Sequence, residues 1–219
     1  MSTIKANNFQ HPSATNPAIV LDASGNAIYA GTHNFIAATV TGAGGLRLIT
    51  PTSIANSGGS ASASGGEVTF TGVSSISLNG VFTSTYDNYI FIMTATNSAG
   101  DEINMRLRVA GADASGTNYV FQRLVAGAGS VTSDRFTGQT VARIGFMPTT
   151  SNAYSVNVYG PAIAAPTMMR SVNAISQSDA TFQDVVARHS LSTAYDGFTL
   201  IPPGGNITGK IRVYGYQNS

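Results

Sequence analysis

Apolar and polar residues alternate with a period of two along most of the chain beyond residue 67. The final run shows the pattern clearly, because Ile211 and Val213 alternate with Arg212 and Tyr214. A two-residue period places successive side chains on opposite faces of a β-strand. No stretch offers a helical face of useful length, so the pattern predicts an all-β protein.

The expected strands are short and are separated by segments rich in Gly, Pro, Asn, Asp and Ser, such as "NSAGDE" and "PPGGN". Many short strands with turn signals between them are typical of a sandwich or barrel, and their number suits an antiparallel jelly-roll sandwich. The strands are expected at Glu67–Phe70, Ile76–Phe82, Tyr86–Asn97, Ile103–Gly111, Asn118–Ala126, Thr140–Phe146, Ala153–Gly160, Thr167–Gln177, Phe182–Leu191, Gly197–Ile201 and Ile207–Tyr216.

The first part of the chain predicts a separate small unit. Apolar runs at Ala18–Leu21 and Asn26–Ala30 flank turn residues, which indicates one β-hairpin, and Leu46–Thr50 is a weaker strand. A lone hairpin is marginally stable in water, so residues 1–55 are expected to pair with copies of themselves or to dock on another protein. The stretch "NSGGSASASGG" (56–66) is interpreted as a flexible linker before a sandwich over 67–219.

One strand is apolar on both faces. In "NYIFIMTAT", Tyr89 and Phe91 lie on one face and Ile90 and Ile92 on the other, so both faces need cover. Tyrosines also oppose the aliphatic face of the last strand, and tyrosine is enriched at subunit interfaces, although isolated surface tyrosines need no explanation. We favour an oligomer interface that includes Tyr89, Ile90, Phe91, Ile92, Tyr214 and Tyr216.

Composition excludes several classes of function. The 219 residues carry a formal net charge of +1, only 10% are charged, and no cysteine is present. Without a basic block we expect no nucleic-acid binding, and without cysteine no disulfide or thiolate chemistry. The N-terminus lacks the apolar run of a signal peptide and no stretch is long enough to span a membrane, so we expect synthesis in the cytoplasm and no membrane insertion.

Candidate catalytic groups are few. "DVVARHS" brings Asp184, His189 and Ser190 together in sequence, but triads assemble in space and no G-x-S-x-G elbow exists, so His189 is interpreted as a surface histidine on a strand. Asp101 and Glu102 are interpreted as turn residues rather than an acid–base or calcium pair. We therefore expect no enzyme activity, no metal site and no cofactor.

Two stretches resemble known proteins. "MSTIKANNFQHPSATNPAIVLDASGNAIYAG" resembles the N-terminal segments of virion fibre proteins from tailed bacteriophages, especially those of cyanobacteria. "FTSTYDNYIFIM" and "GKIRVYGYQNS" resemble the first long strand and the last strand of a jelly-roll module at the ends of such proteins, in tail fibres and in head-decoration proteins alike.

The resemblance implies a homotrimeric tail fibre of the virion. Residues 1–55 would anchor it to a tail or baseplate protein, and the jelly roll would contact a host-surface glycan or protein. The alternative is a capsid cement or decoration protein that staples major-capsid subunits. A third class, a carbohydrate-active enzyme, lacks a paired acid and base.

Strand parity predicts which loops reach the host. If the linker enters at the base of the sandwich, the far end holds the C-terminus and the loops Gly72–Ser75, Asn97–Glu102, Gly127–Thr137, Pro161–Pro166 and Ser192–Asp196. The expected receptor contacts are therefore Asp101, Ser133, Asp134, Arg135, Tyr195 and Asp196.

Overall fold

The computed structural model describes residues 8–9, 19–21, 27–29, 45–175 and 181–218, and it divides the chain into two compact units, Met1–Ala43 and Gly44–Ser219. In the first unit, β1 (Asn8–Phe9), β2 (Ile19–Leu21) and β3 (Ala27–Tyr29) form a three-stranded antiparallel sheet in the order β1-β2-β3. The β2–β3 pair confirms the predicted hairpin. His11 and His33 lie outside the described residues.

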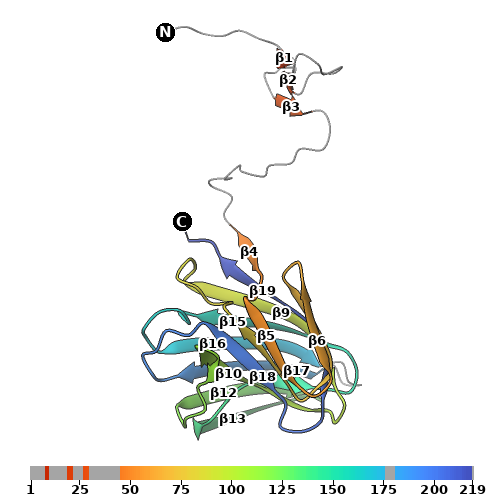
Figure 1. Ribbon diagram of the computed structural model, residues 1–219. Coiled ribbons are helices and arrows are strands. Elements are labelled where there is room, and N and C mark those ends of the chain that lie inside the picture. Colours follow the sequence, from red (N-terminus) through yellow and green to blue (C-terminus); the bar gives the residue numbers. More distant parts are fainter. Residues whose placement is uncertain (1–7, 10–18, 22–26, 30–44, 176–180, 219) are drawn as a thin grey trace. The chain divides into compact units, whose positions relative to one another are not determined.

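The second unit is an antiparallel, jelly-roll-like sandwich of two sheets, and its described residues contain no helix. Figure 1 shows the sheets one in front of the other, with β5, β18 and β10 in the nearer one. The six-stranded sheet has the order β11-β10-β18-β8-β5, with β14 also paired to β10. Its strands are β5 (Ser53–Ser57), β8 (Ser75–Asn79), β10 (Asp101–Val109), β11 (Ala112–Asp113), β14 (Ala142–Met147) and β18 (Gly197–Ile201).

The ten-stranded sheet has the order β13-β12-β17-β16-β15-β9-β19-β7-β6, with β4 also paired to β19. Its strands are β4 (Leu46–Ile49), β6 (Ser60–Ser64), β7 (Glu67–Val73), β9 (Asn88–Asn97), β12 (Tyr119–Gly127), β13 (Ser130–Gln139), β15 (Asn152–Tyr159), β16 (Thr167–Ile175), β17 (Thr181–His189) and β19 (Ile207–Tyr216). The end of the expected strand Thr167–Gln177 falls outside the described residues.

The core lies between the sheets and is built by the two-residue alternation. In β9, Tyr89, Phe91 and Met93 point inward and are at most 1% exposed. Phe91 stacks on Phe198 of the opposite sheet with ring centroids 4.9 Å apart. Burial of side chains of this size contributes about 2–3 kcal/mol each, which makes this contact a main source of stability.

The predicted linker over 56–66 is wrong, because most of it forms strands. β5 pairs with β8, and β6 pairs with β7 across a two-residue turn in which Gly65 and Gly66 have φ of +54° and +84°. Positive φ at both central residues defines the tight turn that matches strand twist. The Ser and Ala side chains of β6 are small, but its backbone completes the sheet edge, so the second unit begins near Gly44 and not after residue 66.

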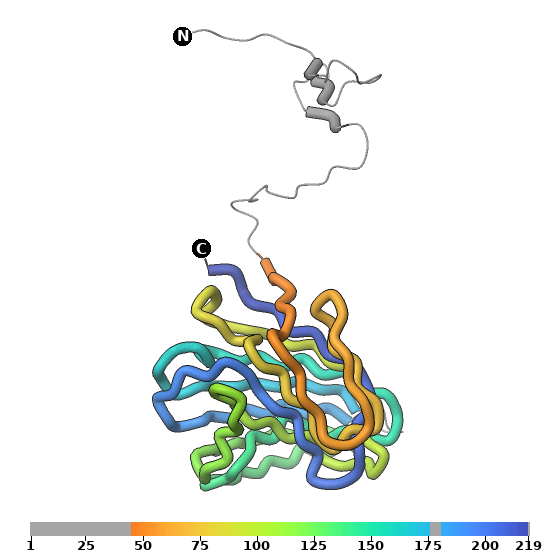
Figure 2. Tube along the Cα trace, in the orientation of Figure 1, coloured from red at the N-terminus to blue at the C-terminus, as the bar shows by residue number. Residues whose placement is uncertain are grey.

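The predicted position of the C-terminus is also wrong. β4 pairs with β19 so that Leu46 lies opposite Tyr216, and Gln217 N donates to Gly45 O over 3.0 Å. Figure 2 shows this first strand of the second unit (orange) beside the last strand (blue). The chain therefore enters the sandwich and terminates at the same end. The parity count failed because β13 was not expected as a strand, and this additional strand reverses the direction of every strand after it.

Candidate functional site

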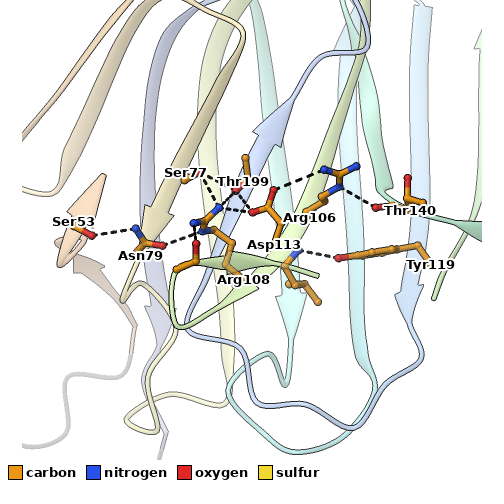
Figure 3. A network of polar contacts seen from close by, with 11 residues as sticks. Ser53, Ser77, Asn79, Arg106, Arg108, Asp113, Tyr119, Thr140 and Thr199 are labelled. Carbon is orange, nitrogen blue, oxygen red and sulfur yellow. Dashed lines mark hydrogen bonds and ion pairs between the residues drawn. The ribbon is translucent and has the colours of Figure 1, made fainter. Parts of the chain in front are cut away.

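The outer face of the six-stranded sheet carries a network of polar contacts centred on Arg108 (Figure 3). Since Met105 and Leu107 point into the core, β10 places Arg106 and Arg108 on the outside. The Arg108 guanidinium donates to Asn79 Oδ1 at 3.0 Å, Ser77 Oγ at 3.1 Å and Thr199 Oγ1 at 2.8 Å, and it also pairs with Asp113 and Gly111 O.

The partners of Arg108 are themselves saturated. Thr199 Oγ1 donates to Asp113 Oδ1 at 2.7 Å, and Asn79 Nδ2 donates to Ser53 Oγ at 3.0 Å. A charged group with this many partners forms strong hydrogen bonds and offers none to a ligand. The network therefore fixes the β10–β11 turn to the sheet, which is a structural role.

A second charged cluster closes one edge of the sandwich. Glu102 pairs with Arg123 at 2.8 Å and Arg143 at 3.1 Å, and Arg123 also pairs with Asp134 at 2.8 Å. Burial raises the pKa of the Glu102 carboxyl, while the two guanidinium groups oppose that rise. The Arg143 guanidinium lies 5.3 Å from the centre of the Phe121 ring, within cation–π range. This cluster joins β10 and β14 to β12 and β13.

The outer face of the ten-stranded sheet is different, because apolar side chains remain exposed on it. Cross-strand neighbours share a face, and register places Leu46, Leu48, Ile90, Ile92, Tyr159, Tyr214 and Tyr216 together on the outside of β4, β9, β15 and β19. Five of these side chains are between 37% and 47% exposed. We call this set the apolar patch. Exposed apolar clusters of this kind mark interaction surfaces.

A shallow groove of about 430 Å³ lies on the same outer face at the other side of the sheet. It is formed by β12, β13, β16 and β17, and we define the arginine groove by its side chains Val120, Gln122, Leu124, Arg135, Val186 and Arg188. The strands β16 and β15 separate its floor on β12 and β17 from the centre of the apolar patch on β9 and β19.

The predicted interface residues divide between these locations. Ile90, Ile92, Tyr214 and Tyr216 lie on the outer face as expected, and Tyr216 Oη donates to Asn157 Oδ1 at 2.8 Å. Tyr89 and Phe91 are wrong as interface residues, because the six-stranded sheet covers them inside the core. The buried Tyr89 hydroxyl donates to Thr83 O at 2.6 Å, which explains how a tyrosine fits there.

The predicted receptor contacts are not brought together. The turn after β9 and the turn between β12 and β13 lie at the end away from the chain entry, whereas the 161–166 and 192–196 loops lie at the entry end, next to β4 and β19. Asp101 begins β10 and its carboxylate accepts from Glu102 N at 2.7 Å. On the expected loop at 127–137, which is instead mostly β13, Ser133 and Arg135 are exposed and Asp134 turns to Arg123.

Tyr195 and Asp196 have internal partners at the entry end. Tyr195 is 2% exposed and its hydroxyl lies 3.0 Å from His189 Nδ1, so it is wrong as a receptor contact. Asp196 Oδ2 accepts from Ala110 N at 2.8 Å. Both residues hold a loop against the sandwich.

His189 is not a surface residue, contrary to expectation. It is fully buried beside Tyr119 and Tyr195, and burial lowers its pKa. Asp184 projects from the opposite face of β17 and pairs with Arg170 at 2.7 Å. The two side chains therefore form no catalytic pair, and within the described ranges no group of three or more His, Asp or Glu side chains is placed to hold a metal ion.

Sequence reasoning missed the arginine groove. The signal was present, because Leu124 and Val186 interrupt the alternation of their strands with apolar residues on the outward side, as Ile90 and Ile92 do in β9. Arg188 continues the outward row of β17 next to the buried His189.

Comparisons with known proteins identify no family for this chain. No family model and no curated protein matches the chain. A solved galectin, LEC-6 of Caenorhabditis elegans, aligns with 68% of this chain and 96% of its own at 11% identity and a TM-score of 0.33. A likeness at this level says nothing about ligands. Among the described residues, none belongs to a helix with the length and apolar character of a membrane span.

Proposed function

We propose that this protein is a non-enzymatic bacteriophage virion component, a homotrimeric tail fibre whose sandwich contacts the host surface. The observation that carries the proposal is the apolar patch, which leaves Leu46, Leu48 and Ile92 more than 40% exposed in one chain. Association of identical subunits is the common way to cover such a surface. Tyrosines at its centre suit a subunit interface, where their rings bury area and their hydroxyls hydrogen-bond.

The N-terminal unit supports an anchoring role. Its described part is a sheet of strands only two or three residues long, and strands this short bury little surface, so docking on a partner protein would stabilise the sheet. The resemblance of residues 1–31 to fibre attachment segments points to a tail or baseplate protein as that partner. Three weak host-binding sites on one assembled tip then act by avidity.

The capsid decoration alternative is favoured by one feature. β4 begins at Leu46, soon after β3 ends at Tyr29, which leaves no room for a shaft between the two units. In this case the first unit would bind the capsid lattice and the sandwich would project from it.

Two measurements test the proposal. Sedimentation equilibrium of the full chain at micromolar concentration is expected to give three times the mass of one chain, and a stably folded single subunit would contradict self-association. Immunogold labelling of purified virions is expected on tails. Labelling over heads would favour the capsid decoration protein over the tail fibre, and absence of the protein from virions would overturn both proposals.

A further inference from the structure

Two arginines of the arginine groove have no carboxylate partner within the described ranges of the chain. Arg135 and Arg188 are exposed, and neither pairs with an acid among the described residues. Most other arginines of the sandwich do pair, namely Arg106, Arg108, Arg123, Arg143, Arg170 and Arg212. The acid that lines the groove, Asp184, pairs with Arg170, whose Nε lies 3.1 Å and whose Nη2 lies 2.7 Å from the Asp184 carboxylate oxygens. The groove is therefore locally positive although the chain is almost neutral.

Register places the two guanidinium groups on opposite sides of one floor. Arg135 lies opposite Gln122 on β12, and Arg188 lies opposite Val120 on the other side of β12. Val120 and Gln122 are two residues apart and share the outer face. Strand geometry separates the two arginine backbones by about 10 Å across the sheet and about 7 Å along it. Long side chains at this separation reach one ligand from two sides.

The floor between the arginines is aliphatic with one amide. Val120, Leu124 and Val186 offer a flat apolar surface to the C–H face of a sugar ring, and Gln122 supplies a donor and an acceptor for hydroxyl groups. A planar carboxylate matches the guanidinium fork, which binds it through two parallel hydrogen bonds. The one exposed aromatic side chain on the outer face of β17 in the described part of the strand, Phe182, lies beyond Asp184 and does not line the groove, so bases would have no stacking platform within it.

We infer that the arginine groove binds an acidic saccharide, with the carboxylate of a uronate-type sugar held by Arg135 and Arg188. The inference rests on the proposed function, since it names the ligand class of the host-contacting sandwich. It is compatible with self-association, because the groove lies on different strands from the centre of the apolar patch.

The experiment compares trigalacturonate with its methyl ester, which differs mainly in charge, by titration calorimetry or NMR on the full chain. The wild type is expected to bind the acid and to bind the ester at least about tenfold more weakly, because hydrogen bonds to charged groups are the strongest contacts. Arg135→Gln and Arg188→Gln are each expected to lower affinity for the acid about tenfold. Arg47→Gln removes an exposed arginine of β4 outside the groove and serves as the matched control.

Equal binding of acid and ester, or wild-type binding by Arg188→Gln, would overturn the inference. Sedimentation of the same variants separates a second explanation. If Arg188→Gln lowers the assembled mass, then the groove is covered by a second copy and the saccharide assignment is wrong. Virion labelling is independent of all these results, so a protein located on tails that does not bind trigalacturonate keeps the proposed function and loses only this inference.

Discussion

The two outer faces of the sandwich share the same strand geometry, but they differ in whether their side chains find partners within the chain. On the six-stranded sheet, Arg108, Asp113 and their neighbours satisfy one another in a closed network. On the ten-stranded sheet, apolar side chains such as Ile92 and Leu124 remain more than 40% exposed, and the two arginines of the groove pair with no acid in the described part of the chain. Groups without partners in one chain are those available to another molecule, which is why both proposed interactions use the ten-stranded sheet.

The closed network predicts the largest loss of stability. Arg108→Ala would leave Asp113 without its main cation, although the Asp113 side chain is only 23% exposed. Removal of one partner from such a pair is expected to lower the free energy of unfolding by about 3 kcal/mol. The matched control on the other face is Arg212→Ala, whose pair with Glu67 is more exposed and is expected to cost less than about 1 kcal/mol.

Urea unfolding of both variants checks this difference. Similar losses in the free energy of unfolding for Arg108→Ala and Arg212→Ala would break the comparison. The ion pairs of the polar face would then stabilise the fold no more than those of the apolar face.

The apolar patch predicts a change in association rather than in stability. Leu48→Glu places a charge directly opposite Tyr214 in the patch, and burial of an unpaired charge in an interface is costly, so self-association is expected to weaken at least about tenfold. Because the Leu48 side chain is 45% exposed, the subunit itself should lose less than about 1 kcal/mol. Sedimentation velocity over a dilution series measures the effect.

The same substitution on the opposite face is the control. Ala55→Glu adds an identical charge at an exposed position of β5 and is expected to leave the assembled mass unchanged. Dissociation by both variants would show that charge alone disrupts assembly, and that the patch has no special role.

How well the sequence predicts a strand depends on the surroundings of its side chains in the fold. Alternation located nearly all long strands, and β18 and β19 have the predicted bounds. β6 and β13 were missed because Ser, Gly and Asp are common in turns, yet an edge strand needs only a paired backbone and polar outward residues. Which face of β9 is covered could not be read from "NYIFIM", since both sides are apolar and only the second sheet decides that Tyr89 and Phe91 are inside.

The buried and exposed sides of β17 predict different responses to pH. His189 is buried, and its pKa is lowered from 6.5 by burial, so below about pH 6.5 the unfolded chain binds more protons than the folded one. Stability from this residue is complete above that value and declines as the pH falls. The thermal midpoint is therefore expected to be lower at pH 5.5 than at pH 7.5.

His189→Gln is expected to reduce that difference, whatever it does to stability at either pH. The raised pKa of Glu102 acts in the opposite sense, because a folded carboxyl that holds its proton more tightly loses stability as the pH rises. If the difference between the thermal midpoints at pH 5.5 and pH 7.5 is unchanged in His189→Gln, then another titratable group causes the pH dependence. The guanidinium groups of the groove stay charged throughout this range, so saccharide binding should persist where stability declines.

The smallest predicted effect concerns an ion pair that borders the arginine groove. Arg170 is 53% exposed, so Arg170→Ala should leave the unfolding midpoint almost unchanged. It releases the Asp184 carboxylate, however, which lines the groove and would then repel an acidic ligand. At a separation of about 8 Å in water such repulsion weakens binding about two- to threefold. The double variant Arg170→Ala with Asp184→Asn removes the freed charge and is expected to restore wild-type affinity for trigalacturonate, whereas a loss that persists in it would mean that Arg170 itself contacts the sugar.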